Sequence, residues 1–250
     1  MRKNLAFTIC LLFLFACDTE NAPDCFQRTG TIVRKQVEVP DFDRILVLPN
    51  IELVIKQEDS ISVVIESGDN LINEVTAKVE DGRLILENTN DCNFVRSFNQ
   101  TKIFVSAPNI VDIRSATQYD ISSDGVLTYP ILVLRSEDFI ENNEGNTTGT
   151  FHIKVTNDKL TTVGNNIASF FIQGTTDVLS VVQASGTGRF EGANLIAKEV
   201  KVRHRGTNKI IVNPQESITG TILSTGDVIV VNRPTIVDVE EFFTGKLIFQ

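Results

Sequence analysis

Few residues of this chain are of types that carry out chemistry, and they are scattered. Only two histidines occur, His152 and His204, and no Gly-x-Ser-x-Gly elbow, phosphate-binding loop, His-Glu-x-x-His or Cys-x-x-Cys motif is present. The densest cluster is Arg203-His204-Arg205, in which strand alternation places the arginines on one side and the histidine on the other. The arginines could contact an anion or an acidic glycan. The plainer interpretation is two surface arginines beside a histidine that is hydrogen-bonded at a corner.

Paired carboxylates are the other chemistry to weigh, because glycoside hydrolysis needs two of them about 5–10 Å apart around one bond. The candidates are Glu137 with Asp138, and Asp112 with Asp120. We interpret all four as solvated charges at strand ends, since they do not recur at a fixed spacing. The sequence therefore predicts no catalytic residue, no cofactor and no metal site.

The four cysteines indicate export. Cys10 falls in an N-terminal apolar run and Cys17 directly follows it, which leaves Cys25 and Cys92 as one even pair. In an oxidising compartment this pair predicts a disulfide. Two buried free thiols are the alternative, whereas a zinc site would need more ligands than this pair and two remote histidines supply.

The N-terminus has the features of a lipoprotein signal. Arg2 and Lys3 precede the apolar run 5–16, whose twelve residues span about 18 Å as a helix, too short to cross a bilayer. Leu14-Phe-Ala-Cys17 resembles a bacterial lipobox, which predicts a signal peptide over 1–16 and lipidation of Cys17. An ordinary secretory signal that happens to contain a cysteine is the alternative.

The segment 17–29 is predicted to be an acidic tether. Its residues 18–24 resemble the export signal of Bacteroidetes-type surface lipoproteins, so we expect attachment to the outer membrane, on its periplasmic or its surface face. No later segment approaches 18 uninterrupted apolar residues.

Composition excludes two classes of protein. The chain has 250 residues, of which 42% are hydrophobic and 22% charged, so wholesale disorder is excluded. The formal net charge is -9, and loss of Arg2 and Lys3 with the signal leaves 21 basic against 32 acidic residues, near -11. A chain this acidic, with no basic patch, is not expected to bind nucleic acid.

The body of the chain reads as short β-branched strands separated by polar turn residues, with a repeat of about 20 residues. Three glycines, Gly186, Gly206 and Gly226, are equally spaced at this repeat, which we attribute to corners that need positive φ. Two apolar columns keep the same step and are predicted to point inward: Val182, Val202 and Ile222, then Phe190, Ile210 and Val230.

This repeat predicts an all-β fold, a right-handed parallel β-helix with about 20 residues per coil. One such domain is expected over 30–250, with a less regular part at 30–100 where Asp81-Gly82 signals a hairpin. A longer step between Ser136 and Gly164 accommodates the polar stretch 141–149, which reads as an inserted loop. A β-sandwich with evenly spaced strands is the alternative.

The same segments resemble a known family, the auto-transporter adhesin head GIN domain of bacterial lipoproteins. The resemblance covers roughly residues 30–245 and implies a right-handed parallel β-helix on an exported, often lipid-anchored protein. It offers no catalytic residue to carry over. The matching segments are Phe42-Asp-Arg-Ile45, Asn50-Ile-Glu-Leu-Val-Ile-Lys56, Val79-Glu-Asp-Gly-Arg-Leu-Ile-Leu86, Ile103-Phe-Val-Ser-Ala-Pro108, Ile113-Arg-Ser-Ala116 and the glycine-cornered repeats.

We therefore expect a lipid-anchored protein of the cell envelope with a non-enzymatic, adhesion-like surface. Its partners would be the membrane and a glycan or envelope protein, and its oligomeric state is open. A carbohydrate-active β-helix enzyme is one alternative. The absence of tryptophan and the presence of only Tyr119 and Tyr129 as tyrosines leave few sugar platforms for it. A structural envelope lipoprotein with no ligand is another.

Overall fold

The computed structural model describes residues 24–90, 92–97, 101–137 and 147–250, which are almost wholly β-strand. The helical elements of these ranges are two short 3-10 helices, η2 (Asp24–Phe26) and η3 (Ile72–Glu74). The strands are β1 (Ile32–Val37), β2 (Arg44–Val47), β3 (Glu52–Gln57), β4 (Ser62–Gly68), β5 (Val75–Glu80), β6 (Arg83–Asn88), β7 (Lys102–Ala107), β8 (Asp112–Ser115), β9 (Ile121–Leu127), β10 (Ile131–Ser136), β11 (Phe151–Gly164), β12 (Phe170–Gln183), β13 (Phe190–His204), β14 (Ile210–Ile222), β15 (Val228–Val230), β16 (Ile236–Glu241) and β17 (Leu247–Phe249). The predicted signal peptide 1–16, Cys17, most of the predicted tether 17–29 and Asp138 lie outside the described residues.

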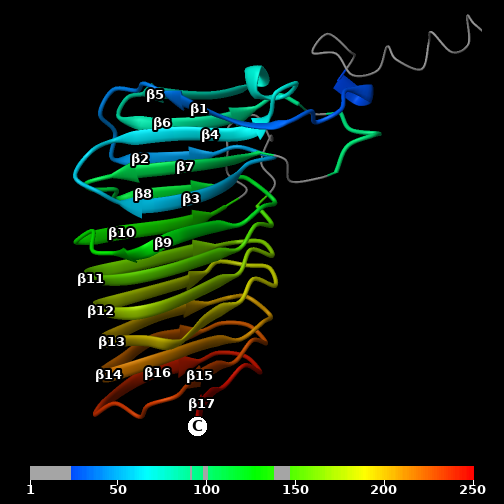
Figure 1. Ribbon diagram of the computed structural model, residues 1–250. Helices are drawn as coiled ribbons and strands as arrows, with labels where there is room; N and C mark the ends of the chain where they lie inside the picture. The colour runs from blue at the N-terminus through cyan, green and yellow to red at the C-terminus, as the bar shows by residue number, and fades with distance from the viewer. Residues whose placement is uncertain (1–23, 91, 98–100, 138–146) are drawn as a thin grey trace, which may run out of the picture.

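The 17 strands of these ranges form one hydrogen-bonded sheet that wraps almost completely around the core, stacked in layers from β5 and β1 to β17 (Figure 1). Their pairings resolve into two columns. The first column is β1–β4–β7–β3–β9–β11–β12–β13–β14–β15–β17. The second is β5–β6–β2–β8–β10–β11–β12–β13–β14–β16. Strands β11 to β14 belong to both, because their first halves pair within one column and their second halves within the other.

From β8 onward the described strand pairs are parallel, and from β11 each strand pairs with the chain about 20 residues later. Phe170, Phe190 and Ile210 occupy successive rungs of the core, each fully buried. In the next layer Ile210 pairs with Val228. The prediction that Val230 continues this column was therefore wrong by two positions. Each layer therefore buries its inward face against the layers beside it.

The second predicted column was also wrong in register. Val202 points inward, but Val182 pairs with Arg203 on the outer face, and Ile222 pairs with His204. The reason is that the number of residues per layer varies. More residues separate paired positions in the second halves of β12 and β13 than in those of β13 and β14. A slip of one residue along a strand moves a side chain to the opposite face of the sheet.

The pairing of the N-terminal strands is less regular than that of the later ones. Strands β2 and β3 do not end the stack. They lie between β6 and β7 on one side and β8 and β9 on the other. Three pairs here are antiparallel, β1–β4, β4–β7 and β5–β6. The last of these is the predicted hairpin, in which Asp81 and Gly82 have φ of 49° and 74°, as a type I′ turn requires.

The three predicted corner glycines do stack, because Thr207 N–H donates to the Gly186 carbonyl at 2.9 Å and Gly226 N–H to the Gly206 carbonyl at 3.2 Å. Positive φ explains only Gly186, at 81°. At Gly226 the cause is space, since a Cβ there would lie 2.2 Å from the Asn208 carbonyl oxygen. The single explanation given for the whole column was therefore wrong for two of its members.

The predicted longer step lies between β10 and β11. Their parallel partners Ser136 and Gly164 are separated by more chain than the partners in any later described layer. Most of the polar stretch 141–149 lies outside the described residues. The extra length is therefore accommodated between two paired strands without interrupting the stack.

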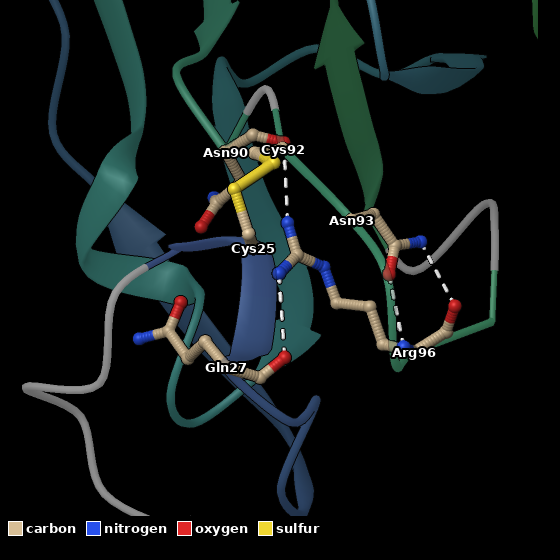
Figure 2. The surroundings of a disulfide bond; sticks show 6 residues. All are labelled: Cys25, Gln27, Asn90, Cys92, Asn93 and Arg96. Carbon is tan, nitrogen blue, oxygen red and sulfur yellow. Dashed lines mark hydrogen bonds between the residues drawn. A yellow bond between two sulfur atoms is a disulfide. The ribbon is translucent and has the colours of Figure 1, made fainter.

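The predicted disulfide is present, joining Cys25 of η2 to Cys92 (Figure 2). Phe94 N–H donates to the Cys25 carbonyl at 2.9 Å. The Arg96 guanidinium donates to the carbonyls of Gln27 at 3.3 Å and of Asn90 at 3.2 Å. The bridge, the arginine and the backbone bond thus fasten the start of the described chain to the segment that follows β6.

Candidate functional site

A hollow on the outside of the described chain lies over the first halves of β11, β12 and β13. Phe151 and Phe170 point inward and stack with ring centroids 4.9 Å apart. Alternation along each strand therefore turns the next residues, His152 and Phe171, outward. These two are strand partners, and their rings stack at 5.2 Å with an interplanar angle of 14°.

Two irregularities of the sheet open this hollow. The register shifts between His152 and Lys154 where β11 meets β9, and between Phe171 and Gly174 where β12 meets β13. Such bulges bend a strand and re-aim its side chains. Gly174 has φ of 117°, and a Cβ there would lie 1.9 Å from the Val155 carbonyl oxygen, so glycine is required at this bulge.

The hollow, which we call the His152–Phe171 groove, has a volume of about 350 Å³, at the lower end of the range for ligand sites. Its lining combines the two aromatic rings with polar side chains. The Ser123 hydroxyl accepts a hydrogen bond from the Lys154 N–H at 2.9 Å, which fixes one side. The lining residues are Ser122, Ser123, His152, Lys154, Phe171, Ile172, Gln173, Glu191, Ala193 and Asn194.

Charged groups of both signs stand at the ends of the groove. The Arg189 guanidinium lies 5.9 Å from the centre of the Phe171 ring and forms an ion pair with Glu191. On the other side, His152 Nε2 lies 3.7 Å from Asp120 Oδ2. His152 and Arg189 therefore lie over the Phe171 ring, and the groove offers a sugar the exposed parts of the two rings together with amide, hydroxyl, amino and carboxylate groups.

Of the candidate catalytic carboxylates, Asp120 lies beside the groove and Asp138 lies outside the described residues, whereas Asp112 and Glu137 are engaged elsewhere. Arg135 Nε donates to Asp112 Oδ2 at 2.6 Å, and Arg114 Nη2 donates to Glu137 Oε2 at 3.2 Å. Arg135 also lies 3.8 Å from Glu137, so these four side chains form one ion-pair network on the outer face of β8 and β10. A glycosidase needs two carboxyl groups facing one bond. Asp112 and Glu137 each face an arginine instead.

The Arg203-His204-Arg205 cluster is divided by the strand. Arg203 and Arg205 are exposed, whereas His204 is fully buried. The Nε2–H of His204 donates to the Asn208 carbonyl at 2.8 Å. Burial lowers the pKa of His204, while the Asn208 bond and the charge of Asp227 oppose that change. The inward histidine is as expected from alternation, and a ligand at the two arginines stays a prediction.

No three His, Cys, Asp or Glu side chains within the described ranges converge as a metal site would require. Nor does any helix in that part of the chain have the length and apolar character to cross a membrane. Sequence reasoning missed the His152–Phe171 groove. Its signal is the recurrence of Phe151-His152 as Phe170-Phe171, which repeats one inward and one outward aromatic position.

Comparison with known proteins gives the family. The family model described as "Putative auto-transporter adhesin, head GIN domain" matches residues 41–234. The chain belongs to this family. No curated protein sequence matches it.

Solved structures with the same fold come from Bacteroides and Parabacteroides. A putative adhesin from Bacteroides fragilis superposes with a TM-score of 0.79 at 22% identity, over 89% of this chain and 99% of that one. A putative adhesin from Parabacteroides distasonis gives 0.63 at 14% identity, over 89% and 99%. A putative lipid binding protein from the same species gives 0.60 at 14%, over 88% and 98%. At these identities the likeness shows the fold alone.

Proposed function

We propose that this head GIN protein is a lipid-anchored component of the outer membrane that binds a glycan, without turning it over, in the His152–Phe171 groove. The observation that carries the proposal is the outward pair of stacked rings, His152 and Phe171, in a groove that polar side chains also line. Sugar recognition needs apolar surface for the ring and directional groups for the hydroxyls, and the groove supplies both.

The fold proposed for this function is a right-handed parallel β-helix of about 20 residues per coil over 30–250, after a signal peptide at 1–16 and a tether at 17–29. The parallel registers and the nearly constant length of chain per layer support it. Right-handed winding follows from the general preference of parallel crossovers. A rigid stack of this kind holds an outward groove in fixed shape, which limits the entropy lost on binding.

The anchor is proposed from the lipobox at Cys17. Each buried CH₂ of an acyl chain contributes about 0.8 kcal/mol, so several chains hold a protein firmly on a membrane. The adhesin names of the family and of the similar structures support a place in the envelope.

The name of the lipid binding protein suggests a second ligand class, but the interior of this chain argues against it. The fully buried rings of Phe151, Phe170 and Phe190 fill the core beside the groove. A lipid tail needs an enclosed apolar cavity. The open groove, lined by both aromatic and polar side chains, suits a sugar better.

Binding to a panel of envelope and host glycans, followed by calorimetry on the best of them, tests the proposal. Replacing Phe171 by alanine removes one of the two stacked rings, so we expect the dissociation constant to rise about tenfold or more. F243A is the matched control, because Phe243 is an exposed phenylalanine near the far end of the stack. Its affinity is expected to be unchanged.

Three results would contradict the proposal. Equal affinity of F171A and the unmodified protein for every glycan that binds would place the site elsewhere. Release of reducing ends from a bound polysaccharide, lost on E137Q substitution, would make the protein the enzyme that we consider the alternative. No glycan binding in the whole panel would favour a structural envelope lipoprotein.

A further inference from the structure

An exposed apolar patch lies at the end of the molecule where the described chain begins. Phe26 of η2 is 54% exposed, Phe94 is 74% exposed and Val95 is 52% exposed. The two rings touch, with centroids 5.8 Å apart. We call these three residues the disulfide-end patch. In Figure 1, η2 and the loop beyond β6 lie at the end of the stack opposite the C-terminus.

The patch is held in place, unlike a loose terminal segment. Cys25, next to Phe26, is bonded to Cys92, two residues before Phe94, and the Phe94 N–H donates to the Cys25 carbonyl. The side chain of Asn93 exchanges two hydrogen bonds with the backbone of Arg96, of 2.9 Å and 2.8 Å (Figure 2). Two exposed phenylalanines are thus fixed side by side by a covalent bond. A rigid, outward-facing apolar pair suggests a partner surface.

The chain that precedes the patch limits where a lipid bilayer can lie. Seven residue steps separate Cys17 from Asp24, and at full extension they span at most about 25 Å, whatever their conformation. The stack from β1 to β17 has ten strand-to-strand steps of about 4.8 Å, or about 48 Å. If Cys17 carries the acyl chains, the tether is too short for the C-terminal end to face the bilayer with the disulfide end pointing away.

We propose that the disulfide-end patch rests on the bilayer into which the acylated Cys17 inserts. The inference depends on the proposed lipid anchor. Phenylalanine and valine side chains partition into the boundary between headgroups and acyl chains. Arg28 is exposed two residues after Phe26 and can contact anionic headgroups there. The stack then projects from the membrane, and the His152–Phe171 groove stands clear of the lipid.

Tryptophan fluorescence tests this seating, because the chain contains no tryptophan of its own. The full-length lipoprotein carrying F94W, purified from a lipoprotein-processing host, is reconstituted into phosphatidylcholine–phosphatidylglycerol vesicles with and without brominated acyl chains. We expect a blue-shifted emission and quenching by about half in brominated vesicles. The matched control is F243W, at a 61% exposed phenylalanine near the far end, which is expected to show neither.

The outcomes separate this inference from the anchor itself. Mass spectrometry of the same preparations reports whether Cys17 is acylated, and an unmodified Cys17 would refute the anchor and the seating together. With Cys17 acylated, equal lack of quenching in F94W and F243W would overturn the seating and leave the anchor. Quenching of F243W alone would also overturn it. A blue shift in F94W that grows with protein density and ignores brominated lipid would assign the patch to a second copy of the chain.

Discussion

The three corner glycines provide a graded test of the fold, because an added methyl group would meet different surroundings at each. At Gly226 a Cβ would lie 2.2 Å from the Asn208 carbonyl oxygen and 2.3 Å from His204 Nε2, the two atoms of a partly buried hydrogen bond. At Gly206 the nearest atom is His204 Cε1 at 3.2 Å. At Gly186 the Asn166 carbonyl oxygen would lie at 2.2 Å, and φ is also positive.

These distances give the order of stability for three single alanine substitutions. G206A requires a shift of a few tenths of an ångström and is expected to cost below about 1 kcal/mol. G226A pushes the backbone apart and strains the hydrogen bond between His204 and Asn208. We expect it to lower the free energy of unfolding by about 3 kcal/mol. G186A adds the strain of a positive φ to a similar clash. We expect it to lower the free energy of unfolding by about 4 kcal/mol.

Urea unfolding followed by far-UV circular dichroism measures the three free energies of unfolding. G125A is the control for backbone strain alone, since Gly125 has φ of 93° with no atom within 4 Å of an added Cβ. It is expected to cost about 1–2 kcal/mol. If G206A proved as costly as G226A, the stacking described here at the corners would be wrong.

Three further predictions concern stability. Because burial lowers the pKa of His204 in the folded state, the unfolded chain takes up a proton first as the pH falls. Stability should therefore be complete above about pH 6.5 and decline below it, and pH-dependent unfolding of H204Q should lack this decline. Burial raises the pKa of Tyr129 to about 12, so stability should fall as the pH rises from about 10, and Y129F should remove that fall. Reduction of the Cys25–Cys92 disulfide, which closes a separation of 67 residues, should cost about 4 kcal/mol in urea unfolding with and without dithiothreitol.

The sequence was sufficient for the features that depend on local pattern. Alternation along β13 predicted that His204 points inward while Arg203 points outward. The hairpin at Asp81-Gly82 followed from turn chemistry alone, and the disulfide from counting cysteines. Each of these inferences needs information from only one segment, or from composition.

What the sequence could not fix is which strand lies beside which. Val182 and Val202 stand at the same spacing as the corner glycines, yet they point to opposite faces because one extra residue enters between the strands. The His152–Phe171 groove was missed for the same reason. It opens where β11 and β12 shift register against their neighbours, and a register shift is a property of two strands together.

The place of β2 and β3 within the stack has a consequence for biogenesis. Both hydrogen-bonding edges of this early layer are taken by chain synthesised later, through to Ser123, the last residue of β9 that pairs with β3. If the polypeptide is exported N-terminus first, β2 and β3 therefore cannot complete their pairing until roughly the first half of the chain has been exported. Beyond that point about 20 further residues suffice for each added layer. We therefore expect folding to begin slowly and the later layers to add rapidly, one after another.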